Sequence, residues 1–198
     1  MRRRTARIEP RIDVSSQTPL IAGWKSDDRY QLTVGRTWWY KRFRAAAYVN
    51  AIVWMAWTVA ILLPFPPFSY LQPIMVGGGA GAWFVIAYFL LLAVAVVGFA
   101  AVSAIVFVIE AHEHRRPNYT IMLIGLVLLY VGTMAGLTLL GLAGAIGGYA
   151  VVVESSTVNA TDILLSPYVN LVTAACLAAI VGAAFTIYGM ATAKATEP

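Results

Sequence analysis

The stretch from Ile121 to Ala150 constrains this chain more than any other, because its thirty consecutive residues carry no charge. About twenty helical residues, at roughly 1.5 Å each, cross the hydrocarbon core of a bilayer. Seven glycines lie in the same stretch, at positions 125, 132, 136, 141, 144, 147 and 148. In water each would cost a helix about 1 kcal/mol relative to alanine, whereas in lipid they let a neighbouring helix approach closely. The stretch therefore predicts a membrane-spanning helix against which the others pack.

The composition extends this prediction to the whole chain. Charged residues make up 12% of the 198 residues and hydrophobic residues 60%, whereas a soluble domain averages about 25% charged residues. We therefore expect an all-α integral membrane protein with four transmembrane helices, packed tightly through seams of small residues. The predicted organisation is a basic amino-terminal tail over residues 1–44, spans at about 45–63, 82–109, 121–150 and 167–190, and a short tail over 191–198.

The basic residues predict the orientation of these spans. Eleven of the fourteen Lys and Arg residues lie within the first 44 positions, and the others are Arg115, Arg116 and Lys194. With four spans, all fourteen fall on one side, while the opposite loops carry only Glu154 and Asp162. The positive-inside rule then predicts that both termini are cytoplasmic. The expected membrane is the plasma membrane, with an organellar inner membrane as the alternative.

The tail ends in an aromatic and basic segment, residues 37–44. Trp and Tyr favour the headgroup level of a bilayer, and Lys and Arg favour its cytoplasmic side. We therefore expect an interfacial anchor formed by Trp38, Trp39, Tyr40, Lys41, Arg42 and Arg44. The alternative is a docking epitope for a protein partner, because aromatic residues and Arg dominate interface hot spots. Anionic lipid headgroups are the expected partner of the tail, and no nucleic-acid-binding module is recognisable.

Small residues spaced four apart predict where helices pack closely. The predicted packing residues are Gly132, Gly136, Gly144, Gly148, Ala175, Ala179 and Ala183. Gly132 and Gly144 are twelve residues apart, which at about 100° per residue leaves them roughly 120° apart around the helix. The two glycine pairs are therefore expected to face different neighbours, one in this chain and one in a partner.

Few residues suggest chemistry. His112 and His114 lie between spans with Glu110 and Glu113, and such side chains suit zinc or copper, so these four are weak metal candidates. The i, i+2 spacing of the histidines does not place both on one helix face, and a solvated turn is the preferred interpretation. No ionisable residue lies in the centre of a span, and no nucleophile–base pair can be assembled. The amide of Asn50 is expected to bond to a neighbouring helix.

These features favour a protein without catalytic activity or cofactor. The first hypothesis is a structural or accessory subunit of a larger membrane complex, such as a respiratory or other energy-transducing assembly, whose partners are other membrane subunits or further copies of the chain. An oligomeric transporter or channel for a small neutral solute is the second hypothesis. The third is a tetraspan membrane scaffold, although that class usually has a large outer loop or paired outer cysteines, and this chain has one cysteine in all.

Overall fold

The computed structural model describes residues 38–76, 79–113, 115–153 and 158–195, with only the backbone for 158–164. The chain divides into two units between Trp38 and Trp39, and the helices described here belong to the second. The main elements are α2 (Trp39–Leu62), α3 (Leu71–Val76), α4 (Gly81–Leu90), α5 (Phe99–Phe107), α6 (Tyr119–Val152) and α7 (Val158–Ala191). Two π-helices, η3 (Leu91–Gly98) and η4 (Val108–His112), continue α4 and α5, and a 3-10 turn, η2 (Phe68–Tyr70), precedes α3.

Four helices among the described residues are long and apolar enough to cross a membrane, which equals the predicted number of spans. They are Trp39–Leu62, Gly81–His112, Tyr119–Val152 and Leu165–Ala191. We call Gly81–His112 the α4–η4 helix. The helix α2 begins six residues before the expected start at Ala45, so most of the predicted anchor segment is helical.

Local sequence explains where these helices begin and end. Pro64, Pro66 and Pro67 follow α2 directly, and proline cannot continue a helix because it lacks an N–H and clashes with the preceding turn. At the start of α6, the side chain of Asn118 accepts hydrogen bonds from the backbone nitrogens of Thr120, at 3.0 Å, and Ile121, at 3.4 Å. This N-cap satisfies two of the donors that a helix start leaves unpaired.

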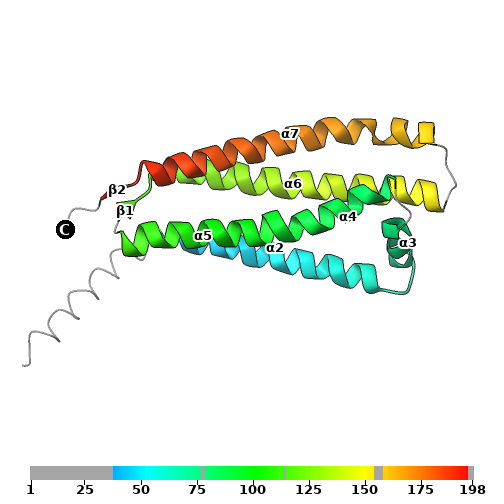
Figure 1. Ribbon diagram of the computed structural model, residues 1–198, viewed down its shortest axis with the longest axis horizontal. Coiled ribbons are helices and arrows are strands. Elements are labelled where there is room, and N and C mark those ends of the chain that lie inside the picture. Colours follow the sequence, from blue (N-terminus) through cyan, green and yellow to red (C-terminus); the bar gives the residue numbers. More distant parts are fainter. Residues whose placement is uncertain (1–37, 77–78, 114, 154–157, 196–198) are drawn as a thin grey trace, which may run out of the picture. The chain divides into compact units, whose positions relative to one another are not determined.

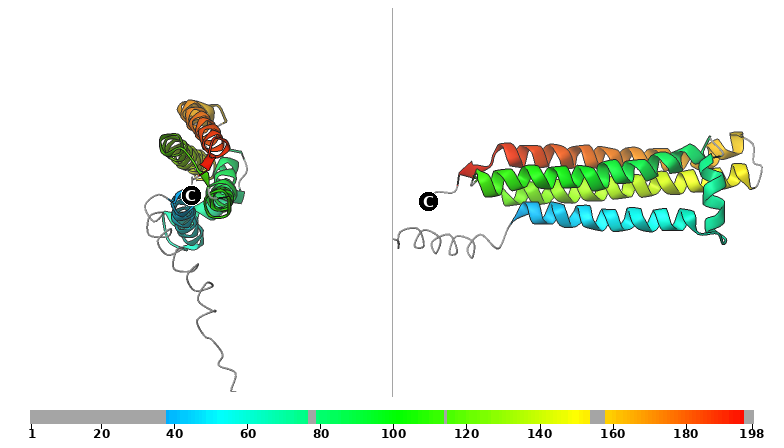
Figure 2. Two further views of the ribbon diagram at one scale, coloured as in Figure 1. Left: turned by 90° about the vertical axis from the view of Figure 1, so that its left-hand side faces the viewer. Right: turned by 60° about the horizontal axis from the view of Figure 1, so that its bottom comes forward.

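The four spans are packed in a row, in which each lies mainly against its neighbour. The helix α7 packs along α6, α4 packs against α6, and α2 packs against η3 and α5. Figure 2 shows the same succession from the end of the bundle. The helix α3 lies across one end, which we call the α3 end, and its buried Ile74 contacts α4 and α6. The outer helices α2 and α7 therefore each have one long face that no other described helix covers.

A short antiparallel ladder closes the opposite end, which we call the basic end. The strand β1 (Arg115–Arg116) pairs with β2 (Lys194–Ala195), so the α5–α6 connection is joined to the segment after α7. The sequence predicts only a turn in this connection. Two opposed residues on each side were too few to produce a strand pattern in the sequence.

Candidate functional site

Helix α6 contacts its two neighbours through different glycines. A Cβ atom at Gly132 would lie 2.5 Å from the backbone nitrogen of Ala179 and 2.7 Å from the backbone oxygen of Ala175. At the α3 end, Gly144 lies directly against the backbone of α4 at Phe84. The structure thus places one predicted pair of glycines against α7 and the other against α3 and α4, all within this chain.

The other predicted packing residues lie in the same two interfaces or beside them. Gly136 faces the side chain of Ala175, with a would-be Cβ distance of 3.4 Å, and Gly148 lies against Ile74 of α3. Ala183 is half-buried on α7. The backbone of Gly182 touches the backbone of α6 at Leu129, so glycine on α7 complements glycine on α6.

The interface between α2 and the α4–η4 helix is polar instead. Asn50 is fully buried, and its Nδ2 donates to the carbonyl of Ala95 in η3 at 2.6 Å, which confirms the expected bond to a neighbouring helix. The Ser103 hydroxyl donates to the carbonyl of Tyr40 at 2.8 Å, and the Thr58 and Tyr88 hydroxyls are hydrogen-bonded at 3.0 Å. We call this set of contacts the α2 polar seam.

Two buried polar atoms in the α2 polar seam have no hydrogen-bond partner among the described residues, namely Asn50 Oδ1 and Trp54 Nε1. They lie one helical turn apart on the face of α2 that meets η3 and α4, where the Trp54 ring stacks on Tyr88 at 5.6 Å. π-Helical segments often occur at functional positions. Here the carbonyl of Ala95 in η3 accepts the hydrogen bond from Asn50. The seam therefore holds α2 against the α4–η4 helix near the middle of α2.

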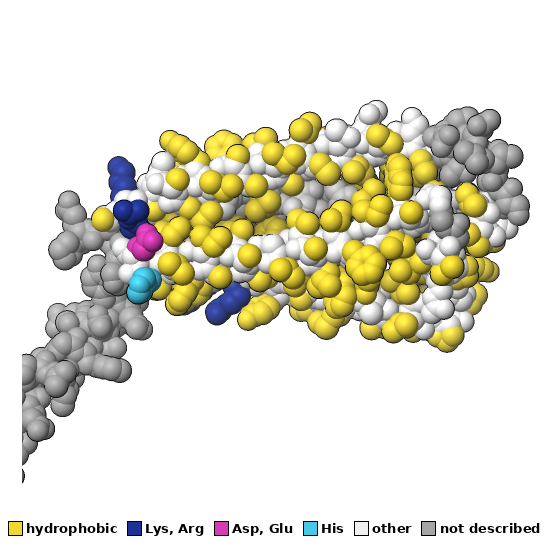
Figure 3. All heavy atoms as spheres, viewed as in Figure 1, with side chains coloured by type: hydrophobic (Ala, Val, Ile, Leu, Met, Phe, Trp, Pro, Cys, Tyr) yellow, Lys and Arg dark blue, Asp and Glu magenta, His cyan; other side chains and the backbone are white. Residues whose placement is uncertain are grey.

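Charged side chains gather at the basic end (Figure 3). Glu110 is half-buried, and its two carboxylate oxygens accept hydrogen bonds from the backbone nitrogens of Trp39, at 3.0 Å, and Tyr40, at 3.2 Å. These are the first two residues of α2, where a helix has unpaired N–H groups and attracts negative charge. Glu110, a candidate metal ligand in the sequence, is therefore the cap of α2.

The predicted anchor residues divide between the interior and the surface. The Trp39 side chain is only 2% exposed and packs with Phe43 in the core, so its ring does not face the headgroups as the sequence suggested. The Arg42 guanidinium lies 4.4 Å from the Trp39 ring and 5.5 Å from the Tyr119 ring. Arg44 lies 5.7 Å from the Tyr40 ring. These cation–π contacts explain why aromatic and basic residues alternate here.

Lys41 is exposed and lies 6.0 Å from the Tyr40 ring, while Trp38 is half-buried just before α2. For the metal candidates, the described residues contain no group of three His, Cys, Asp or Glu side chains placed to hold an ion. His112 and Glu113 are exposed, and Glu113 lies 3.9 Å from Arg115. His114 lies outside the described residues.

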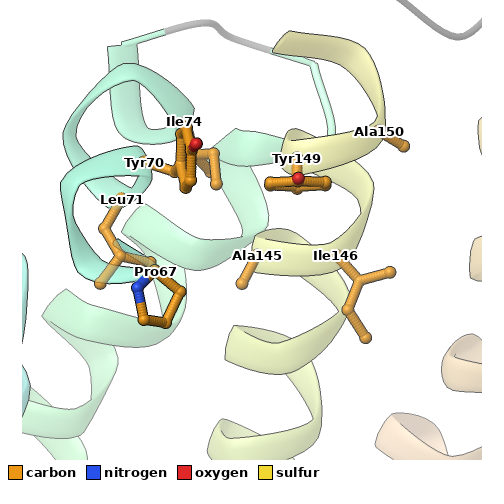
Figure 4. Close-up of a pocket in the computed structure, with 8 residues that line it drawn as sticks. All are labelled: Pro67, Tyr70, Leu71, Ile74, Ala145, Ile146, Tyr149 and Ala150. Carbon is orange, nitrogen blue, oxygen red and sulfur yellow. The ribbon is translucent and has the colours of Figure 1, made fainter. Parts of the chain in front are cut away.

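A pocket of about 450 Å³ lies at the α3 end, between the segment 67–74 and the last turns of α6. Figure 4 shows that it is lined by Pro67, Tyr70, Leu71, Ile74, Ala145, Ile146, Tyr149 and Ala150. The Tyr70 and Tyr149 rings meet edge to face, with 5.5 Å between their centroids. Two phenol hydroxyls among apolar side chains suit an apolar molecule better than a polar solute.

The face of α7 that no other described helix covers carries an amide that was not among the predicted site residues. Asn170 is exposed and makes no hydrogen bond with the described residues. The predicted span 167–190 has 24 residues, or about 36 Å against roughly 30 Å of hydrocarbon, so a centred span places Asn170 just inside the hydrocarbon boundary. The signal was present in the sequence, because Asn170 is the one amide in the predicted span 167–190.

Asn170 belongs to a regular row of exposed residues. Steps of four and three residues, the spacing of a coiled-coil seam, connect Ser166, Asn170, Thr173, Leu177, Ile180, Ala184 and Ile187, and all of them are exposed. We call this row the α7 outer seam. Ala184 lies nine residues from Ala175, which at about 100° per residue puts the row half a turn from the face that contacts α6. Leu177, Ile180 and Ile187 are 59%, 64% and 62% exposed.

Four apolar helices of spanning length are typical of a multi-pass integral membrane protein. No protein-family model, curated protein or solved structure matches the chain.

Proposed function

We propose that this chain is a non-catalytic structural subunit of a larger membrane protein complex, and that it enters the complex as a pair of copies joined through the α7 outer seam. The observation that carries the proposal is the exposed amide of Asn170 at membrane depth, which has no hydrogen-bond partner among the described residues. An amide facing lipid lacks partners for its donors and its acceptor, and a second helix supplies them.

A second copy suits this seam for two reasons. An amide both donates and accepts, so two Asn170 side chains complement each other. Copies related by an axis along the membrane normal also carry Asn170 at the same depth, as an isologous interface requires. A single Asn at such a position is known to fix register in coiled coils. Beyond Lys41 and Arg44, the outer face of α2, with Tyr48, Ile52 and Val59, is apolar and suits lipid or a further subunit.

Buried polar groups support a structural role. The side chains of Asn50 and Ser103 are buried, and each donates to a backbone carbonyl of a neighbouring helix, so these two donors are used in packing helices. The buried Thr186 hydroxyl donates to the carbonyl of Gly182 in its own helix. The described Lys and Arg residues are in the first turns of α2, in β1 and in β2, which places them at or near the basic end. By the positive-inside rule, we propose that this end faces the cytoplasm of a plasma membrane.

The native cysteine provides a sharp test of the pairing. Cys176 is exposed and is the only cysteine of the chain, and Leu177, next to it, lies on the α7 outer seam. Moving the thiol by one residue, with Cys176→Ser and Leu177→Cys together, turns it about 100° into the seam. Oxidation in native membranes should give a dimer of the variant and little dimer of the wild type.

Adding Asn170→Leu to the Leu177→Cys variant should lower the dimer yield about fivefold or more, as expected for a membrane hydrogen bond worth roughly 1 kcal/mol or more. If the Leu177→Cys variant formed a disulfide with a different protein, the subunit role would stand, and the pairing of two copies through α7 would be overturned. Purification in mild detergent tests the complex itself. A chain that migrates as an isolated monomer, with no other protein enriched, would overturn the subunit role.

A further inference from the structure

Two cations face each other across the ladder at the basic end. Arg116 is directly opposite Lys194, whereas Arg115 is opposite Ala195. Directly opposed residues of an antiparallel pair project from the same face, with Cβ atoms about 4.5–5.5 Å apart, and like charges there are destabilising. This register is therefore unfavourable unless an anion lies between the two side chains.

No acidic side chain of the described residues provides that anion. The ion pair found among them joins Arg115 to Glu113, and both Arg116 and Lys194 are exposed without such a partner. Glu110 is close enough to Arg116 to attract it. However, both Glu110 oxygens already accept backbone hydrogen bonds at the start of α2. One carboxylate engaged elsewhere does not balance two cations.

The location of the pair identifies the anion. The ladder lies just beyond the ends of three candidate spans, which end or begin at His112, Tyr119 and Ala191. Beside it, the Tyr119 ring is 47% exposed and packs on Trp39 at 5.3 Å. Aromatic rings with basic residues at span ends mark the headgroup level of a bilayer. The anions abundant at this level are lipid phosphates.

We propose that Arg116 and Lys194 together bind the phosphate of an anionic phospholipid headgroup. The planar guanidinium of Arg116 matches two phosphate oxygens, and the Lys194 ammonium adds a point charge and further donors. The acyl chains lie along exposed apolar side chains of α6, including Leu123, which is 37% exposed. The bound phosphate converts the repulsive pair into a bridge that holds the α5–α6 connection to the end of α7. This inference stands apart from the pairing of α7.

The full chain, purified in a neutral detergent, can be titrated with phosphatidylglycerol, phosphatidylcholine or inorganic phosphate while its thermal unfolding midpoint is measured. Phosphatidylglycerol should raise the midpoint of the wild type. The concentration for half of this rise should increase about tenfold in Arg116→Gln and in Lys194→Gln, as for a lost charge-assisted bond. Arg115→Gln is the matched control, because it removes the same charge from the opposite face of the same strand.

A second readout separates binding from folding. Without lipid, Lys194→Gln should have a midpoint equal to or above that of the wild type, because it removes the repulsion with Arg116. If Arg115→Gln lost as much of the lipid response as Arg116→Gln and Lys194→Gln, the site would be overturned. The lipid would then be attracted by the overall positive charge of this end of the protein. Phosphatidylcholine carries the same phosphate on a headgroup without net charge, so an equal response to it would overturn the selectivity for an anionic lipid. An equal response to inorganic phosphate would replace the lipid by a free anion.

Discussion

The α6·α7 interface and the α2 polar seam join neighbouring helices by opposite means. Between α6 and α7, glycines at 125, 132, 182 and 189 bring one helix directly against the other. Between α2 and the α4–η4 helix, hydrogen bonds of Asn50, Thr58 and Ser103 combine with stacked rings such as Trp57 on Phe84, 5.4 Å apart. The first interface should therefore be destabilised by any side chain that adds volume. The second should be destabilised when a polar or aromatic side chain is replaced by an aliphatic one of similar size.

The largest effect should come from adding a methyl group to the glycine interface. In Gly132→Ala, the new Cβ would meet backbone atoms of Ala179 and Ala175 at 2.5 and 2.7 Å, and backbone cannot move aside as a side chain can. We expect a loss of about 2–3 kcal/mol in the free energy of unfolding, as for an overpacked core. Unfolding by a denaturing detergent measures this change.

Gly98 of η3 offers a matched control for this substitution. The nearest atom to a Cβ at Gly98 is the Ala93 carbonyl oxygen, at 3.7 Å, which is an ordinary contact. Gly98→Ala should therefore be neutral, or stabilise the protein by up to about 1 kcal/mol through helix propensity. Equal effects of the two substitutions would show that close approach does not hold α6 to α7.

A moderate effect is expected in the polar seam. Asn50→Leu keeps the approximate volume but removes the bond to the Ala95 carbonyl in η3. Hydrogen bonds between membrane helices average about 0.6 kcal/mol and reach about 1.7 kcal/mol. We expect a loss near 1 kcal/mol, because Asn50 Oδ1 already lacks a hydrogen-bond partner among the described residues of the wild type. The same unfolding assay measures it, and a more stable variant would show that the amide is retained for some purpose other than packing.

The two interfaces also differ in how far the sequence predicted them. Glycines and alanines spaced four apart predicted the residues that lie between α6 and α7, because small residues at this spacing let two membrane helices approach closely. The contact of Gly144 with Phe84 could not be predicted, because no periodic pattern tells which helix will cross there. The partner of Asn50 could not be predicted either. It is a backbone carbonyl, which every residue has, so no residue type in the sequence marks it.

At the basic end, the residue types could be read from the sequence, but their partners could not. Glu110 was grouped with the histidines because carboxylate and imidazole are neighbours in the chain. In the folded chain its partners, Trp39 and Tyr40, lie about seventy residues away, with separations of 71 and 70. The burial of the Trp39 ring was also unpredictable, because a ring at the end of a span can face either lipid or a neighbouring helix.

The smallest of these effects concerns Glu110, whose carboxylate joins the ends of α2 and the α4–η4 helix. Glu110→Gln keeps the shape but leaves one acceptor oxygen for two backbone donors, and it removes a charge that favours a helix start. A capping residue contributes about 0.5–2 kcal/mol, and the retained oxygen should limit the loss to the lower part of this range. Glu113→Gln is the control, since its exposed contact with Arg115 spans 3.9 Å and such pairs contribute little. If Glu113→Gln destabilised the protein as much as Glu110→Gln, general loss of negative charge would account for both, and the capping role of Glu110 would be wrong.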